Sequence, residues 1–157
     1  MVMDKLIQQL KRHEGYRQNA YRCPAGKVTI GYGYNLEANP LHLSSLEINH
    51  AHKSGMDKIE AERLLKLMVS RIIDQLEVAI PFINQLGPTR QDVLINMTYN
   101  LGLAGLLKFK KMLAAVKSGQ YEKAAEEMLN SKWRSDVGDR AQELSMQMAT
   151  GVYANVN

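Results

Sequence analysis

The stretch of sequence that decides the fold runs from residue 13 to residue 33 and reads HEGYRQNAYRCPAGKVTIGYG. Residues 4–14 place apolar side chains at helical spacing, and Gly15, a common residue just past a helix end, predicts the stop. Residues 23–26 form a turn signal, and residues 27–32 alternate apolar and polar side chains as a β-strand does. The sequence therefore predicts a helix followed at once by a β-hairpin.

Most of the remaining sequence has a helical pattern. A long apolar repeat begins at Asp57, where Glu60 three residues later resembles a capping box, and it ends at Pro81. The irregular stretch between residues 35 and 55 predicts only a short helix, near residues 45–50. Further helical patterns follow, over residues 88–101, 107–118, 120–131 and 138–150.

These elements predict the α+β class, with a small α/β lobe that holds the hairpin and a larger helical lobe. We expect a single domain over residues 1–157. The small lobe is predicted over residues 16–56, a bridging helix over residues 57–80, and the helical lobe over residues 1–15 and 81–157. A cleft between the two lobes is then the expected place for a site.

The charge and composition of the chain limit its partners. The chain carries a formal net charge of +4, which suits nucleic acid, anionic membranes or anionic cell walls alike. Basic clusters such as residues 108–111 are too short for a nucleic-acid-binding tail and predict solvated helix faces, so we expect no nucleic-acid partner. The nine methionines predict core packing.

We expect no internal disulfide, no structural metal and no membrane span. The one cysteine, Cys23, has no partner for an internal disulfide. His50 and His52 lack acidic or thiol partners at metal-ligand spacing, which predicts a solvated loop. The N-terminus lacks an apolar signal-peptide core, and no apolar run approaches about 20 residues. These features predict a cytoplasmic monomer without a cofactor.

Glu14 is the first candidate for chemistry in the deciding stretch. It ends the first predicted helix, where the helix dipole disfavours negative charge, and it adjoins the β lobe. A carboxyl group that keeps its proton beside a cleft can serve as a general acid. The helix and hairpin patterns alone favour the alternative, a solvated carboxylate at a helix end.

The spacing of three residues around the hairpin resembles that of the phage-type lysozymes, or endolysins. Eight residues separate Glu14 from Cys23 and five separate Cys23 from Thr29, and members of that family carry Glu, then Asp or Cys, then Thr at these intervals. The resemblance continues in order along nearly the whole chain. It includes HEGYR at 13–17, TIGYG at 29–33, LINMTYNLG at 94–102, SKW at 131–133 and GDRA at 138–141.

The resemblance implies hydrolysis of the β-1,4 bond between N-acetylmuramic acid and N-acetylglucosamine in bacterial peptidoglycan. Glu14 would protonate the departing glycosidic oxygen, and Thr29 would help to place a water on the other face of the sugar. Cys23 stands where T4-like members have Asp. Two roles stay open for it, a thiolate base that activates water and a small structural turn residue.

The resemblance also implies which residues contact the substrate. Gly31, Tyr34 and Asn100 are expected there, with Tyr34 lining the cleft. Asn96 and Asn100 share one face of the predicted helix, and we expect Asn96 to cap internal groups and Asn100 to bind sugar. Trp133 is expected in the core rather than at the sugar.

Arg140 resembles an arginine of the family that pairs with the catalytic glutamate. That pairing would support Glu14, although a nearby cation favours the ionised carboxylate and so opposes its use as an acid. The alternative is an arginine on the surface, paired with Glu143 three residues later on the same predicted helix.

Two other functions compete with hydrolysis. A membrane-disrupting protein would use a basic amphipathic helix such as residues 107–118, for which we favour a core-facing helix with a wet basic side. A lytic transglycosylase would cut the same bond without a positioned water, and Thr29 at the water-placing position argues against it. The resemblance further implies release from the host cytoplasm to the periplasm and cell wall through a separate holin-like protein.

Overall fold

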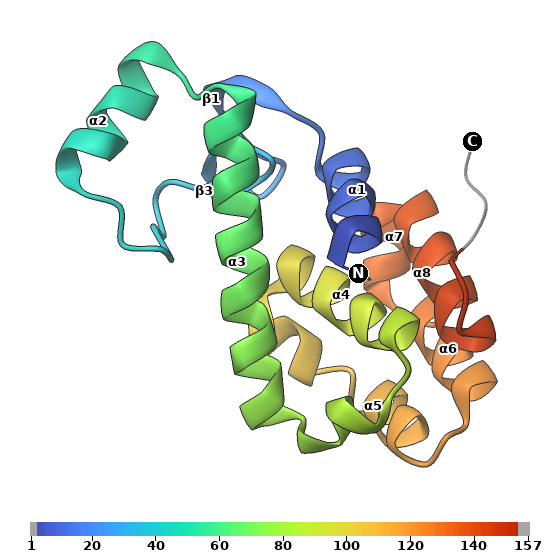
Figure 1. The fold of residues 1–157 in the computed structure, drawn as a ribbon. Coiled ribbons are helices and arrows are strands. Elements are labelled where there is room, and N and C mark those ends of the chain that lie inside the picture. Colours follow the sequence, from blue (N-terminus) through green and yellow to red (C-terminus); the bar gives the residue numbers. More distant parts are fainter. Residues whose placement is uncertain (1–2, 154–157) are drawn as a thin grey trace. The chain divides into compact units, whose positions relative to one another are not determined.

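The computed structural model describes residues 3–153, which fall into two compact units. Unit 1 comprises Met3–Arg71 and unit 2 comprises residues 72–153, and the long helix α3 (Lys58–Ala79) belongs to both (Figure 1). The bounds of α3 agree with the bridging helix predicted over residues 57–80. Unit 1 includes the first helix, which the sequence analysis assigned to the helical lobe. The cleft between two lobes stays a prediction.

The first helix of unit 1 ends where the sequence pattern predicts. α1 (Met3–Glu14) buries the apolar side chains of its helical stripe, Leu6, Ile7 and Leu10. The N–H of Gly15 donates to the carbonyl of Lys11 at 2.9 Å, and the φ of +72° at Gly15 is a left-handed conformation that glycine adopts without strain. The chain therefore leaves the helix directly after Glu14 and enters the sheet.

Three short antiparallel strands form the sheet of unit 1. They lie in the order β1 (Arg17–Arg22), β2 (Val28–Gly31) and β3 (Tyr34–Asn35). Tyr21 lies opposite Thr29 across the first pair of strands, and Ile30 lies opposite Tyr34 across the second. Ile30 is completely buried, which fixes the face that β2 turns inward. The predicted hairpin is confirmed, and a third strand extends it.

Capping side chains start the other two helices of unit 1. Ser44 caps α2 (Ser45–Ser54) through a reciprocal capping box with Glu47, so the short helix expected in the irregular stretch forms and runs further than predicted. Asp57 caps α3, because the N–H of Glu60 donates to its Oδ1 at 2.8 Å.

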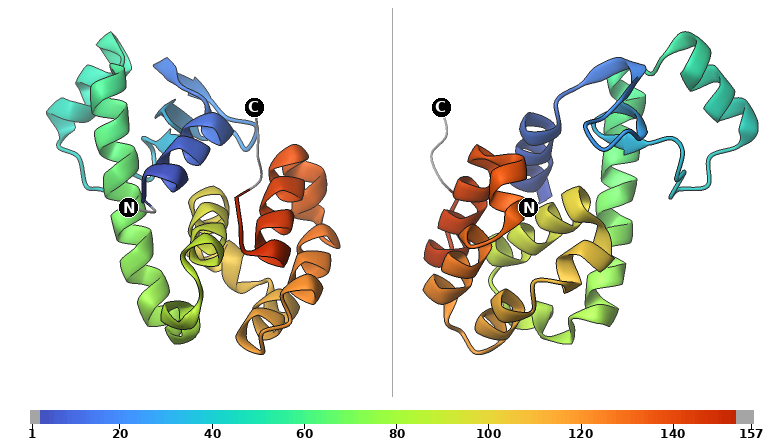
Figure 2. Two further views of the ribbon diagram at one scale, coloured as in Figure 1. Left: turned by 45° about the vertical axis from the view of Figure 1, so that its right-hand side comes forward. Right: turned by 180° about the vertical axis from the view of Figure 1, so that it is seen from behind.

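Unit 2 is all helical in the part of the chain that the structure describes. After the C-terminal part of α3 come η1 (Pro81–Gln85), α4 (Pro88–Leu107), α5 (Lys110–Lys117), α6 (Tyr121–Leu129), α7 (Lys132–Val137) and α8 (Asp139–Thr150). α6 contacts α5, α7 and α8, and α4 packs on α8 (Figure 2). The sequence analysis missed η1 and α7, because segments this short do not show a helical period. The mostly helical chain with one small sheet confirms the α+β class.

Methionine takes a large part in the core of unit 2. Met97, Met112, Met128 and Met148 have no exposed surface, which confirms the core-packing interpretation for these four residues. Within residues 3–153, none of the helices is long and apolar enough to cross a membrane.

Candidate active site

Glu14 lies against the hairpin, as expected from its place at the end of α1. Its side chain is half-buried, and its carboxylate lies over the Cα of Gly33 in the turn between β2 and β3. Gly33 has no side chain to displace the carboxylate. The position of the carboxyl group is therefore set by both the end of α1 and the turn between β2 and β3.

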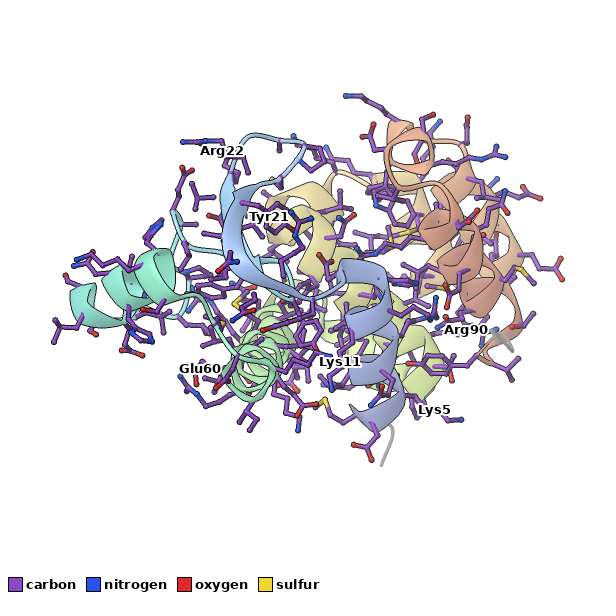
Figure 3. All side chains as sticks on the ribbon, turned by 90° about the horizontal axis from the view of Figure 1, so that it is seen from above. Lys5, Lys11, Tyr21, Arg22, Glu60 and Arg90 are labelled. Atoms are coloured by element: carbon purple, nitrogen blue, oxygen red, sulfur yellow. The ribbon has the colours of Figure 1, made fainter. Side chains whose placement is uncertain are left out.

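Tyr21 lies on β1 next to Arg22 (Figure 3). Its hydroxyl is within electrostatic reach of two of the candidate catalytic groups, Glu14 and Cys23. Burial raises the pKa of the Tyr21 hydroxyl most, and negative charge on Glu14 and on Cys23 raises it further. Arg17 opposes this effect, with its guanidinium 4.3 Å from the centre of the Tyr21 ring. The sequence analysis missed Tyr21, although the strand register that places it opposite Thr29 could have indicated it.

The thiol of Cys23 sits in the turn between β1 and β2. The N–H of Cys23 donates to the carbonyl of Lys27 at 3.0 Å, and the N–H of Gly26 donates to the carbonyl of Cys23 at 2.7 Å. Hydrogen bonding from the backbone of Lys27 lowers the pKa of the Cys23 thiol, against the raising effect of burial. The backbone of Ala25 and the side chain of Thr29 lower the pKa further, so the turn stabilises a thiolate.

Thr29 is buried at the start of β2, with 5% of its surface exposed. Its hydroxyl donates to the carbonyl of Lys27 at 2.9 Å. Because a hydroxyl has only one proton, this bond leaves the oxygen lone pairs of Thr29 to accept. Thr29 can therefore accept a hydrogen bond from a water, and the same hydroxyl proton stabilises the thiolate of Cys23 when it turns from Lys27 to the sulfur.

Gly31 is buried against α3. A Cβ added to Gly31 would lie 3.0 Å from the Cβ of Ala61 and 3.2 Å from the Sδ of Met56, so glycine allows the sheet to approach the helix closely. The structure gives Gly31 a packing role, and a substrate contact through its backbone stays a prediction.

The expectation that the side chain of Tyr34 lines a cleft is wrong. Only 3% of Tyr34 is exposed, and burial raises the pKa of its hydroxyl. That hydroxyl donates to Oδ1 of Asn39 at 2.9 Å and accepts from the N–H of Leu41 at 3.3 Å. Tyr34 therefore holds the loop after β3 in place rather than presenting a polar group to sugar.

Arg140 lies at the start of α8 in unit 2, where it is buried rather than on the surface. Its Nε and Nη2 donate to Oδ1 of Asn96 at 3.0 and 2.8 Å, and Asn96 has no exposed surface. The surface alternative for Arg140 is therefore wrong. Asn96 serves an internal partner as predicted, although that partner is a guanidinium and not a backbone group.

Asn100, in contrast, is exposed near the middle of α4. The indole Nε1–H of Trp133 donates to its Oδ1 at 2.7 Å, and the rings of Trp133 and Phe109 meet edge to face with 5.9 Å between ring centres. Only 4% of Trp133 is exposed, which confirms it as a core residue. The hydrogen bond fixes which way the amide of Asn100 turns, because its oxygen faces the indole.

Two further observations bear on other kinds of site. Within residues 3–153, no group of three or more His, Cys, Asp or Glu side chains could hold a metal ion. α5 buries Met112, Ala115 and Val116 and exposes its lysines. The interpretation of this segment as a core-facing helix with a wet basic side is confirmed.

The structure thus places Glu14, Cys23 and Thr29 on the same small sheet, with Glu14 at the turn between β2 and β3 and Cys23 and Thr29 at the turn between β1 and β2. Tyr21 on β1 lies within electrostatic reach of both Glu14 and Cys23. Asn100 and Arg140 belong to unit 2. A carboxyl group, a thiol and a hydroxyl on one small sheet are the kinds of group that acid-assisted hydrolysis uses.

Comparison with known proteins finds a matching family and several similar proteins. A family model described as phage lysozyme matches residues 11–148. The probable T4-type lysozyme 2 of Dictyostelium discoideum is 27% identical over 96% of this chain and 96% of that protein. The endolysin of Bacillus phage B103 is 32% identical over 84% of this chain and 45% of that protein. The pre-baseplate central spike protein Gp5 of Enterobacteria phage T4 is 27% identical over 93% of this chain and 28% of that protein.

The family match includes the helix end at Glu14, the hairpin with Cys23 and Thr29, and most of unit 2. It therefore spans residues of both units. The chain belongs to the phage lysozyme family and is a lysozyme-type glycoside hydrolase.

Proposed function

We propose that the chain is an endolysin that hydrolyses the β-1,4 bond between N-acetylmuramic acid and N-acetylglucosamine in bacterial peptidoglycan. The observation that carries the proposal is the carboxylate of Glu14 lying against the same small sheet that holds Cys23 and Thr29, with Tyr21 in electrostatic reach of both Glu14 and Cys23. Relatives named lysozyme and endolysin support the same class of substrate.

Glu14 is the general acid in this proposal. Its carboxyl proton passes to the glycosidic oxygen as the bond from that oxygen to C1 of the sugar breaks. A water oxygen bonds to C1, and Thr29 orients this water by accepting one of its protons in a hydrogen bond. The hydrogen bond that the Thr29 hydroxyl donates to the carbonyl of Lys27 supports this role. It uses the hydroxyl proton and leaves the oxygen lone pairs of Thr29 to accept from the water.

Cys23 is the base that receives a proton from the water. The lowered pKa of its thiol supports this role over a purely structural one, because a larger fraction of thiolate is present near neutral pH. The thiolate takes over the part played by a carboxylate in glycosidases that use two carboxyl groups. In the structural alternative, the proton passes to solvent and Thr29 alone places the water.

Other groups bind the sugar chain or support the acid. We propose that the amide of Asn100 and the backbone of Gly31 bind the glycan, and that Arg140 supports Glu14. The exposure of Asn100 favours its role, since its oxygen is already held by Trp133 and its amide N–H groups can donate. The two relatives named endolysin support a lysis role. We further propose that the protein is a monomer held in the host cytoplasm until a separate holin-like protein releases it to the wall.

Clearing of purified peptidoglycan by the wild type, Glu14→Gln and Cys23→Ser across pH tests the proposal. Glu37→Gln is the matched control, because Glu37 is an exposed carboxylate of unit 1 that pairs only loosely with Arg22, at 3.6 Å. We expect Glu14→Gln to lose activity by about 10³-fold and Glu37→Gln to keep it. Mass spectrometry of the released fragments should show ordinary reducing ends.

Each alternative predicts a different result. Clearing by Glu14→Gln at the wild-type rate would overturn the proposal and favour membrane disruption. Anhydro ends on the products would overturn hydrolysis in favour of a lytic transglycosylase. A Cys23→Ser variant with near-normal activity would assign Cys23 to the structural role, whereas a strong loss would assign it to the base.

A further inference from the structure

Gly33 is set apart from the other glycines of the hairpin region by what lies over its Cα. A Cβ added to Gly33 would lie 2.4 Å from Oε1, 3.0 Å from Cδ and 3.4 Å from Cγ of Glu14. The end of one side chain therefore fills the volume in which any other residue would place its Cβ.

Backbone conformation alone does not explain this arrangement. Gly33 has a φ of +74°, but Gly15 and Gly26 also have left-handed φ values, +72° and +81°, and a Cβ at either position would meet nothing within 4 Å. At those two positions glycine is needed only for the left-handed backbone conformation. At Gly33 the backbone is also left-handed, and the space that a Cβ would take is in addition occupied by the carboxyl group of Glu14, the proposed acid.

We propose that Gly33 is a positioning residue for Glu14: it leaves the volume in which the carboxyl group is held against the turn between β2 and β3. This inference rests on the proposed function of Glu14 as the acid. A side chain at position 33 pushes the carboxyl group out of this volume. Ordinary contact begins at 3.4 Å, so a Cβ at 2.4 Å from Oε1 displaces that oxygen by about 1 Å.

The displaced group is the far end of a flexible side chain, so Glu14 moves and the fold survives. A misplacement of about 1 Å at a reacting group lowers the rate by about 100-fold. Substrate binding should change little, because the proposed sugar contacts are made by Asn100 and the backbone of Gly31 rather than by this carboxyl oxygen. Gly33→Ala should therefore lower kcat by about 100-fold and leave KM within about twofold.

The test measures kcat and KM on soluble peptidoglycan fragments for Gly33→Ala and for Gly26→Ala, the matched control. Both substitutions place alanine at a left-handed φ in the same hairpin region, but only the first crowds Glu14. Gly33→Asn and Gly26→Asn form a second pair, because asparagine tolerates left-handed φ better and still carries a Cβ. This pair decides the question if Gly33→Ala does not fold.

A double-mutant cycle with Glu14→Gln shows whether Gly33 acts through the carboxyl group. We expect Glu14→Gln to lower kcat by about 10³-fold in the wild type and by only about tenfold in the Gly33→Ala background. Equal losses in both backgrounds, or a kcat of Gly33→Ala equal to that of Gly26→Ala, would overturn the inference alone. Full activity of Glu14→Gln in the wild-type background would instead overturn the proposed function.

Discussion

Asp92 on α4 offers a quantitative test of the electrostatics of unit 2. It is 5% exposed, and burial raises the pKa of its carboxyl group to about 6 from an ordinary 3.8. The hydroxyl of Tyr153 donates to Oδ2 of Asp92 and partly offsets this rise. Replacing Asp92 with Asn keeps an acceptor for Tyr153 and removes the titration.

The direction of the effect follows from where the proton is held more tightly. Between about pH 4 and pH 6 the folded chain keeps the proton of Asp92 and the unfolded chain releases it, so rising pH favours unfolding. The stabilising contribution of protonated Asp92 is complete below pH 4 and is lost as the pH rises through 6. For a pKa raised this far, the loss amounts to about 2–3 kcal/mol.

Urea and thermal unfolding of the wild type and Asp92→Asn at pH 4 and pH 7.5 measure this loss. Relative to the wild type, Asp92→Asn should gain about 2–3 kcal/mol between the two pH values, or about 4–12 °C in Tm for a chain of this size. Asp74→Asn is the control, because Asp74 lies exposed on α3 and its substitution should give no such gain. An equal difference between wild type and Asp92→Asn at both pH values would refute the reasoning.

Three further predictions concern the hairpin and Arg140. The rate of alkylation of Cys23 by iodoacetamide, followed against pH, should have its midpoint below the pKa of about 8.5 of a free cysteine. Thr29→Val should raise that midpoint. A wild-type midpoint at or above about 8.5 would contradict the stabilised thiolate. Arg140→Lys should lower the free energy of unfolding in urea by about 2 kcal/mol, because lysine cannot make the paired bonds to Asn96; an unchanged midpoint would show that these bonds contribute nothing. In thermal unfolding, Gly31→Ala should destabilise the chain by about 3 kcal/mol and Gly26→Ala by about 1 kcal/mol, because Gly31 packs against α3 and Gly26 does not. Equal losses of stability in the two variants would mean that backbone strain alone matters.

The elements that the sequence predicts well are those with local signals. The end of α1 follows from an apolar stripe and Gly15, and the start of α3 follows from Asp57 and Glu60, all of which are close in sequence. The order of Glu14, Cys23 and Thr29 is also a local pattern. Such signals act over a few residues, so the sequence alone displays them.

The parts that the sequence does not predict depend on neighbours that are distant along the chain. Tyr34 was expected at the substrate, but burial of its ring and the bonds of its hydroxyl to the following loop decide its place. Arg140 is buried because Asn96, 44 positions away, accepts from it. Gly33 lies inside the TIGYG motif, yet its contact with Glu14 exists only once α1 and the sheet are in place.

The residues proposed for acid–base chemistry and those proposed for glycan binding fall mostly into different units of the chain. The acid, the candidate base, the water-placing hydroxyl and the glycine that makes room for the acid all belong to unit 1. The proposed residues of unit 2, Asn100 and Arg140, are held instead by hydrogen bonds to Trp133 and Asn96. Because the proposed bond-breaking groups lie close together in sequence, one helix end and one small sheet carry all of them. In the same proposal Asn100 of unit 2 binds the glycan, so substitutions at Asn100 should act on KM more than on kcat.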